Sequence, residues 1–167
     1  MGAGKNKRLV LRIGPPHMIR AGVVLLTTNG LAAIERVRDG MTYYTLPGGG
    51  VEDGETPQEA AVRETHEELG LIVRVDGLVA LVNFRGSTQY YYRAEVLGGQ
   101  FGTGTGEELS SPATSKAGTY QPVWLDERQL AVRDVRPASI AQALAAAPDP
   151  DRLVKEWFST PLVVDEV

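Results

Sequence analysis

The sequence predicts a single α/β domain in which helices pack on a β-sheet. Three observations support this. Short apolar stretches typical of strands recur along most of the chain, one helix in the middle has clear start and stop signals, and two more helices are expected near the end. The chain has 167 residues, of which 43% are hydrophobic, and this is enough to bury the core of one domain.

The first predicted strands precede a run of three glycines. Residues 1–20 are expected to be an arm, basic at its start, with a short strand over residues 9–13. Residues 21–37 are expected to be two strands joined at Asn29 and Gly30, a pair that favours a two-residue hairpin turn. Residues 41–47 are a further strand that leads into Gly48, Gly49 and Gly50. Such glycines most often make a turn, but they also let the backbone approach a ligand closely.

The second half of the chain continues with strands and ends in helices. Residues 71–84 are rich in strand-forming residues with a break at Asp76 and Gly77, and residues 88–97 and 119–125 are two further strands. A loop rich in Gly, Ser and Thr occupies residues 98–118. Helices are expected over residues 126–132 and 138–147. The domain is therefore placed at residues 21–147, and residues 148–167 are a tail expected to pack on the domain or on a partner subunit.

The helix in the middle of the chain is marked at both ends. Thr56 is a good N-cap, Pro57 suits the first helical position, and Glu59 completes a capping box. Gly70 suits the position just after the last turn. These signals predict a helix over residues 57–69.

Three carboxylates share one stripe of this helix. At about 100° per residue, Glu67 and Glu68 fall on either side of Glu64, a turn above Ala60 and Ala61. Like charges so spaced repel one another. Oxygen ligands beside small residues are what a Mg²⁺ or Mn²⁺ site requires, although a solvated acidic face explains them equally well. Core contacts are expected on the opposite side, at Val62, Thr65 and Leu69.

The composition excludes several kinds of site. The chain has no cysteine, which excludes disulfides, cysteine-type zinc sites and thiol catalysis. His17 and His66 are its two histidines, so a multi-histidine metal site is excluded as well. A net charge of −4 disfavours binding of a nucleic-acid polymer. The sequence shows neither a signal peptide nor a membrane-spanning stretch, so a cytoplasmic protein without membrane contact is expected.

The glycines and the acidic helix together resemble the Nudix box, G-x5-E-x7-R-E-U-x-E-E-x-G-U, in which U is aliphatic. The match runs over residues 49–71, and seven fixed identities occur at the required spacing: Gly49, Glu55, Arg63, Glu64, Glu67, Glu68 and Gly70. Thr65 stands where the family has an aliphatic residue. Its angle on the helix puts it beside the expected core face, so only a small effect on stability is expected.

The resemblance implies an α/β/α sandwich around a mixed sheet, with the box as a loop–helix–loop motif. It also implies hydrolysis of the pyrophosphate bond in a nucleoside diphosphate linked to another group, in a nucleotide, nucleotide sugar or ADP-ribose type of compound. Glu64, Glu67 and Glu68 would hold Mg²⁺ or Mn²⁺, joined by a backbone carbonyl of the glycine turn, assigned to Gly49. Glu55 and Arg63 would bind one another and hold the loop against the helix. With the three glutamates, they form the expected set of catalytic residues.

Residues outside the box are weaker candidates. Glu107 and Glu108, in the long loop, are candidates for the general base or for a further metal ligand. The alternative is that they belong to a solvated loop with no role in the site. Arg85 and Arg93 are candidates for binding phosphate, although Arg93 fits a surface cross-strand pair equally well. Tyr43 and Tyr44 precede the glycines, and one of them, assigned as Tyr44, is a candidate for stacking on a nucleobase; the alternative is packing in the core.

The strand over residues 88–97 has two expected faces. One face is predicted to be core and carries Tyr90, Tyr92, Ala94 and Val96; Tyr91, Arg93 and Glu95 share the other, where Glu95 is a further candidate base. His66 is expected to be structural and Trp124 to pack in the core.

Two other functions share this type of fold. A module that senses a nucleotide or nucleotide sugar without cleaving it is the alternative to the hydrolase; loss of box glutamates would favour it, and none is lost. An isomerase of the isopentenyl diphosphate type would need a cysteine, which the chain lacks. The nucleoside diphosphate derivative itself is not fixed by the box. The apolar residues 9–13 and 161–167 are candidates for a homodimer contact.

Overall fold

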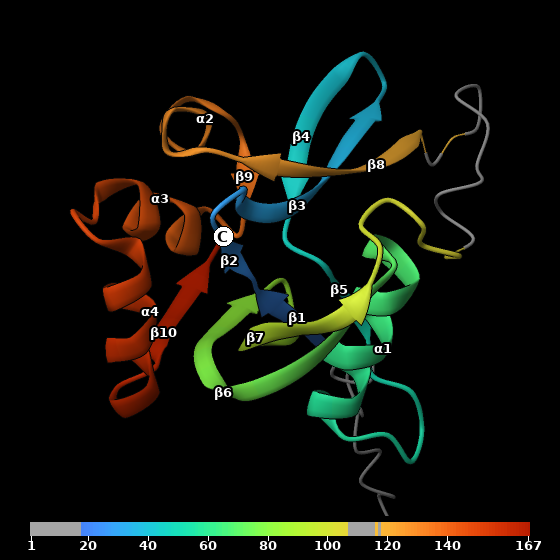
Figure 1. The fold of residues 1–167 in the computed structure, drawn as a ribbon, viewed down its shortest axis with the longest axis horizontal. Coiled ribbons are helices and arrows are strands. Elements are labelled where there is room, and N and C mark those ends of the chain that lie inside the picture. Colours follow the sequence, from blue (N-terminus) through green and yellow to red (C-terminus); the bar gives the residue numbers. More distant parts are fainter. Residues whose placement is uncertain (1–17, 107–115, 117) are drawn as a thin grey trace, which may run out of the picture.

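The computed structural model describes residues 18–106, 116 and 118–167, so the predicted strand over residues 9–13 lies outside it. Figure 1 shows strands at the centre with helices on either side. The helices are α1 (Pro57–Leu69), α2 (Glu127–Val132), α3 (Ala138–Ala146) and α4 (Pro150–Ser159). The strands are β1 (Met18–Val24), β2 (Leu26–Thr27), β3 (Gly30–Arg38), β4 (Met41–Thr45), β5 (Gly48–Gly50), β6 (Leu71–Phe84), β7 (Ser87–Gly99), β8 (Thr119–Leu125), β9 (Val135–Arg136) and β10 (Leu162–Glu166).

Within these residues the strands form two five-stranded sheets. The first has the order β10-β6-β7-β1-β5; the second has the order β2-β3-β4-β9, with β8 paired to the other side of β3. Both are mixed, since β1 runs parallel to β7 and β4 parallel to β9 while their other neighbours are antiparallel. The predicted mixed α/β architecture is confirmed, with two sheets in place of one.

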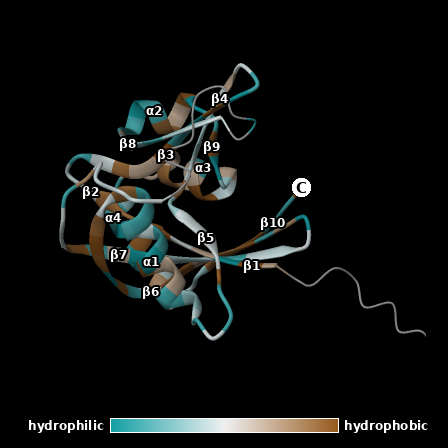
Figure 2. Cartoon of the chain, turned by 90° about the vertical axis from the view of Figure 1, so that its right-hand side faces the viewer, coloured by the Kyte–Doolittle hydropathy of each residue, from teal (hydrophilic) through white to brown (hydrophobic). Residues whose placement is uncertain are grey.

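Two apolar clusters hold the layers together. One lies beneath α1 and combines Ala60 and Leu69 with Ala21, Val23 and Ile34 of the sheets. The other joins both sheets to α2, α3 and α4. Figure 2 shows hydrophobic residues along β3 and β6 and hydrophilic residues at the tip of the β3–β4 hairpin. Burying the inner faces of the strands beneath helices on both sides provides the main stabilisation of the domain.

The ends of α1 confirm the predicted capping. The backbone N–H of Glu59 donates to the Thr56 hydroxyl at 3.2 Å, and the Thr56 N–H donates to the Glu59 carboxylate at 2.9 Å. Gly70 ends the helix in a left-handed conformation, with φ of 77°. Glycine adopts this conformation without steric cost, so the helix stops where the sequence indicates.

The buried face of α1 differs from the one predicted. Ala60, Ala61, Thr65 and Leu69 are buried, whereas Val62 is only half-buried. The alanines therefore pack in the core and do not leave room for a ligand, which corrects the sequence interpretation. Their small size has a different consequence: the helix backbone can approach the sheet closely, so that the carboxylates next to the alanines reach β5.

Four further local predictions are corrected. Asp76 and Gly77 do not interrupt the strand but mark a register shift within β6, as a β-bulge does. The three glycines form the strand β5 and not a turn. Tyr91 is buried, although it was expected on the outer face, because β7 lies inside the first sheet between β6 and β1 and is covered on both faces. Val96, expected in the core, is 40% exposed.

The C-terminal residues pack back on the domain. Val154 and Trp157 of α4 are buried in the cluster shared with α2 and α3, and β10 pairs in parallel with β6. The Glu166 carboxylate accepts hydrogen bonds from the Ser139 backbone N–H at 2.7 Å and from its hydroxyl at 2.5 Å. Trp124 is half-buried against the other cluster and stacks on Phe101. No helix in the described residues is long and apolar enough to cross a membrane.

Candidate active site

The site begins with the pairing of β5 to β1. Gly49 is aligned with Ala21, and the flanking backbone hydrogen bonds run from Val23 N–H to Pro47 O and from Val51 N–H to Ile19 O, both at 3.0 Å. Backbone groups alternate in direction along a strand, so residues 47, 49 and 51 face β1. The amide and carbonyl groups of Gly48 and Gly50 therefore face the other way, toward α1.

Side chains of α1 bind these outward-facing groups. The Gly48 N–H donates to Glu68 Oε2 at 2.9 Å, and Arg63 Nη2 donates to the Gly50 carbonyl at 3.0 Å. Glu64 lies directly against Gly49, since a Cβ on that glycine would be 2.3 Å from Glu64 Oε1. Any side chain at position 49 would therefore displace the Glu64 carboxylate, and the helix and β5 form one unit.

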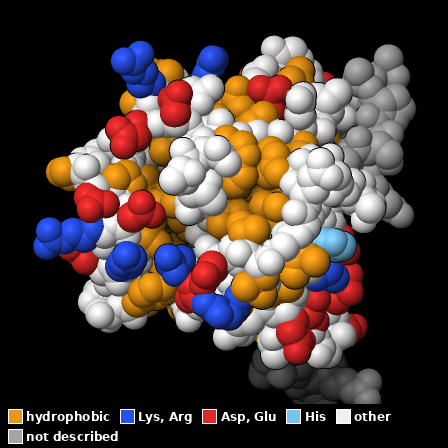
Figure 3. Space-filling model, in the orientation of Figure 1, with side chains coloured by type: hydrophobic (Ala, Val, Ile, Leu, Met, Phe, Trp, Pro, Cys, Tyr) orange, Lys and Arg blue, Asp and Glu red, His pale blue; other side chains and the backbone are white. Residues whose placement is uncertain are grey.

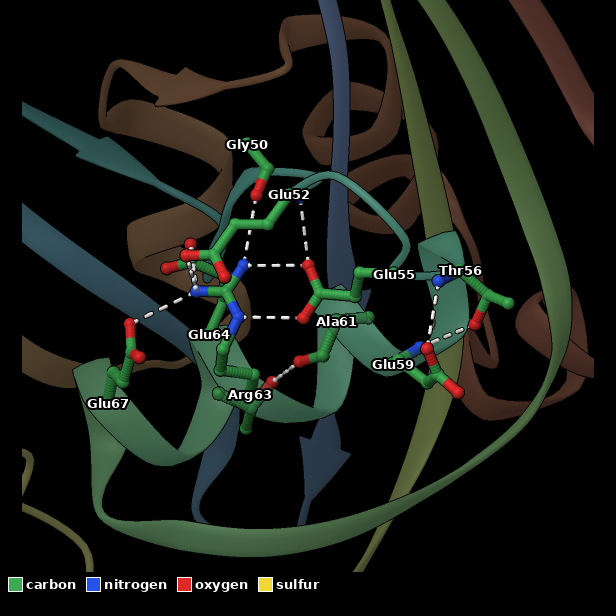
Figure 4. Close-up of polar contacts among 10 residues, drawn as sticks. Gly50, Glu52, Glu55, Thr56, Glu59, Ala61, Arg63, Glu64 and Glu67 are labelled. Carbon is green, nitrogen blue, oxygen red and sulfur yellow. Dashed lines mark hydrogen bonds and ion pairs between the residues drawn. The ribbon is translucent and has the colours of Figure 1, made fainter.

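Arg63 lies at the centre of this unit (Figure 4). Its Nε and Nη2 donate to the two oxygens of Glu55 at 2.7 and 3.0 Å, and its Nη1 donates to Glu64 at 2.9 Å and to Glu67 at 3.3 Å. The hydrogen bonds that Arg63 donates to Glu55 lower the pKa of the Glu55 carboxyl, and the same hydrogen bonds raise the pKa of Arg63. The Glu55–Arg63 pair therefore joins the loop before α1 to the helix.

The donor chemistry of the box fits a divalent metal ion. Acidic side chains gather over α1 in Figure 3, and carboxylate oxygens are the ligands that Mg²⁺ and Mn²⁺ prefer. Glu64 and Glu67 both bind Arg63, and in the described part of the chain no three acidic or histidine side chains converge on one point. Among the glycine carbonyls, that of Gly48 faces α1, whereas that of Gly49, assigned as a ligand from the sequence, faces β1.

A large pocket adjoins the box. It has a volume of about 950 Å³, and Glu64, Glu68 and the three glycines of β5 form one part of its wall. Residues of both sheets complete it, including the arginines Arg20, Arg36, Arg85 and Arg136. This volume lies within the range of pockets that hold small-molecule ligands. The arrangement places acidic side chains and several guanidinium groups around one cavity.

The predicted residues outside the box fall in different places. Arg85 lines the pocket from the turn between β6 and β7. Arg93 does not line it: this side chain forms an ion pair with Asp76, which is the surface pairing that the sequence also allowed. Glu95 is exposed and paired with Arg74. Glu107 and Glu108 lie outside the described residues.

Tyr44 lies in the core and not at the pocket. The residue is 7% exposed, its hydroxyl donates to Glu35 at 2.9 Å, and its burial raises the pKa of the hydroxyl. The neighbouring Tyr43 points to the opposite face of β4, beside Arg36 and Arg136. The choice between the two tyrosines therefore depends on strand register, which residue type does not specify.

Several pocket residues were missed from the sequence. Arg20, Arg36 and Arg136 come from three separate strands, and Tyr91 at the pocket wall donates from its hydroxyl to Gln89 at 2.8 Å. Alternation in β3 was the one available signal, since Arg36 follows two positions after the buried Ile34. That signal alone does not distinguish a pocket arginine from a surface arginine.

Comparison with known proteins agrees with the fold and the box. The NUDIX domain family model matches residues 16–156. A MutT-like protein of Streptomyces ambofaciens is 34% identical over 125 residues, covering 73% of this chain and 75% of that protein. An RNA pyrophosphohydrolase of Tolumonas auensis is 39% identical over 69 residues, but that match covers only 41% of this chain and 38% of the relative.

Solved structures show the same fold at low sequence identity. A MutT protein from Methanosarcina mazei superposes with a TM-score of 0.57 at 16% identity, covering 84% of this chain and 95% of the other. An ADP-ribose pyrophosphatase from Streptococcus suis gives a TM-score of 0.54 at 15% identity, covering 90% and 99%. From the family match, the box and the fold, we conclude that this chain belongs to the Nudix hydrolase family.

Proposed function

We propose that the protein uses a divalent metal ion to hydrolyse the pyrophosphate bond of a nucleoside diphosphate linked to another group. The observation that carries this proposal is the position of Glu64 and Glu68, which are held against β5 at the wall of the 950 Å³ pocket. The names of similar proteins, RNA pyrophosphohydrolase, ADP-ribose pyrophosphatase and UDP-X diphosphatase, support the same reaction type. The nucleotide, nucleotide sugar and ADP-ribose classes are all candidate substrates.

Glu64, Glu67 and Glu68 are the residues that would hold Mg²⁺ or Mn²⁺, with the carbonyl of Gly48 as a backbone donor on the same side. A bound divalent ion supplies Lewis acidity and lowers the pKa of a coordinated water. Arg63 orients Glu64 and Glu67 through its Nη1, and Glu68 is oriented by the Gly48 N–H. These contacts hold the three carboxylates beside β5, from where they would turn toward a bound ion.

The remaining pocket residues bind and orient the substrate. Arg20 of β1 and Arg85 of the β6–β7 turn present positive charge to the pocket that the three glycines also line. Guanidinium groups bind phosphate oxygens with paired, charge-assisted hydrogen bonds. Glu107 and Glu108 stay candidates for the general base, in a segment that the structure does not describe.

The test is product release from a panel of nucleoside diphosphate derivatives with Mg²⁺, with Mn²⁺ or with EDTA. The expected result is cleavage of at least one compound by the wild-type protein, abolished by EDTA and by Glu68→Gln. His66→Gln is the matched control, since His66 is exposed on the same helix and lines no part of the pocket. Tight binding of one compound without turnover would instead support the sensing alternative.

A further inference from the structure

A row of alternating tyrosine and arginine side chains crosses the second sheet. Tyr120 of β8 and Tyr43 of β4 are both aligned with Arg36 of β3, from the two strands that flank it. Cζ of Arg36 lies 3.5 Å from the centre of the Tyr120 ring and 5.6 Å from that of Tyr43. Arg136 of β9 extends the row, with its Cζ 4.2 Å from the Tyr43 ring centre. We call these four residues the arginine–tyrosine row.

The row lies on the face of the second sheet that borders the pocket. Arg36 shares this face of β3 with Ile34, which packs in the cluster beneath α1. Arg36, Tyr120 and Arg136 line the same pocket as the box glutamates, but they come from the other sheet. A ligand bound at the box therefore has this row as a second wall.

Stacking on Tyr120 determines which side of the Arg36 guanidinium faces a ligand. A guanidinium nitrogen lies about 1.3 Å from Cζ, so a group turned edge-on at this distance would push a nitrogen into the Tyr120 ring. The 3.5 Å separation therefore requires the guanidinium to lie face to face with that ring. A ligand meets the edge of the group, where the N–H groups lie, and this edge matches the oxygens of a phosphate.

Arg36 and Arg136 are held in different ways. Arg136 donates to both oxygens of Asp134, at 3.2 and 2.8 Å. Arg36 is half-buried, lines the pocket and stacks on Tyr120 at 3.5 Å, and partial loss of water strengthens the attraction of a guanidinium for an anion. Its closer stacking and its position between two rings make Arg36 the member of the row best suited to bind a ligand.

We propose that Arg36, held by Tyr120 and Tyr43, binds a phosphate group that the substrate carries in addition to the pyrophosphate that is cleaved. This inference rests on the proposed function for the rest of the ligand, a nucleoside diphosphate derivative. The additional phosphate has two chemical sources. It is either a third phosphate at the end of the chain or a phosphate on a ribose.

The test compares ligands that differ by that one phosphate. Binding of ATP against ADP, and of NADP⁺ against NAD⁺, is measured by calorimetry with Mg²⁺ in the Glu68→Gln background, where turnover is expected to be absent. In one pair, the ligand with the extra phosphate should bind at least about tenfold more tightly. That pair identifies whether the additional phosphate is at the end of the chain or on a ribose. Arg36→Gln should remove the preference and leave the affinity for ADP or NAD⁺ within about twofold.

Arg38→Gln is the matched control, because Arg38 is an exposed arginine on the same strand that lines no part of the pocket. If Arg36→Gln does not fold, Arg36→Lys replaces it, since it keeps the charge but lacks the planar fork; loss of the preference is again expected. Absence of a preference in both pairs, or a preference that survives substitution of Arg36, would overturn the inference.

Hydrolysis by the wild-type protein is scored separately. An Arg36-dependent preference without any turnover would overturn the proposed hydrolysis and leave the phosphate site intact. Turnover without an Arg36-dependent preference would overturn the phosphate site alone.

Discussion

The guanidinium of Arg63 donates a hydrogen bond to each oxygen of the Glu55 carboxylate, from Nε at 2.7 Å and from Nη2 at 3.0 Å. The Glu55 side chain is 14% exposed and that of Arg63 is 24% exposed, so water screens the pair only in part. The same guanidinium also reaches Glu64, Glu67 and the Gly50 carbonyl. The geometry of α1 relative to β5 thus depends in part on one ion pair outside the set of proposed metal ligands.

Replacing Glu55 with Gln should weaken this pair and loosen the loop before α1. We expect a loss of about 1–2 kcal/mol in the free energy of unfolding, measured by urea denaturation. Activity should fall about tenfold to a hundredfold, because the oriented carboxylates lose their support. Glu127→Gln, at an exposed position on α2, is the control and should change neither quantity.

The same pair should make the fold sensitive to acid. The pKa of Glu55 is lower in the folded chain than in the unfolded chain, chiefly because of Arg63. Its stabilising contribution is therefore complete above the unfolded pKa of about 4.3 and is lost as the pH falls through the lower folded pKa. Thermal melts should show that lowering the pH from about 5 to 3 destabilises the wild type more than Glu55→Gln. Equal slopes for the two proteins would contradict this.

The three glycines of β5 should respond differently to alanine. A Cβ at Gly49 would meet the carboxylate of Glu64 at 2.3 Å, so Gly49→Ala should displace that side chain and lower activity about a hundredfold with little loss of stability. A Cβ at Gly48 would meet the Ala21 carbonyl at 2.6 Å, and since backbone cannot move aside, Gly48→Ala should destabilise the fold by about 1–3 kcal/mol.

Gly50→Ala is the internal control for this series, because its Cβ would meet open space. Each variant is measured for both melting temperature and turnover of the identified substrate. The interpretation fails if Gly49→Ala keeps full activity, or if Gly50→Ala is impaired as strongly as its neighbours.

Thr65→Val should leave the protein nearly as stable as the wild type, within about 1 kcal/mol. Thr65 is fully buried and its hydroxyl donates to the Ala61 carbonyl at 2.7 Å. That carbonyl is also the ordinary acceptor of the helical hydrogen bond from residue 65, so it keeps a partner when the hydroxyl is removed. Denaturant unfolding of the two proteins measures the difference, and a loss above about 2 kcal/mol would show that the hydroxyl has a structural role.

The sequence was most informative where the determinants are local. The bounds of α1 follow from Thr56, Pro57, Glu59 and Gly70, all within or beside the helix, and they were predicted to the residue. The buried face of the same helix was predicted less well, because it depends on how closely Ala60 and its neighbours let the sheet approach.

The pocket depends on long-range pairing, and the sequence does not show it directly. Arg20, Arg36 and Arg136 lie far apart in the chain and meet only because β1, β3 and β9 occupy particular places in two sheets. The strand β5 consists of glycines alone, so it has no side-chain pattern from which pairing with β1 could be recognised. Tyr44 illustrates the same limit, since a shift of one residue would exchange its face with that of Tyr43.

The strand β5 is also the last strand of the first sheet, and an open edge of this kind can recruit strands of other protein molecules. Here the outward-facing Gly48 N–H and Gly50 carbonyl are bound by Glu68 and Arg63. Two side chains of the candidate active site thus also block a route to aggregation. Variants that remove them should be examined for self-association as well as for lost turnover, because a weakened box would expose a bare edge of backbone.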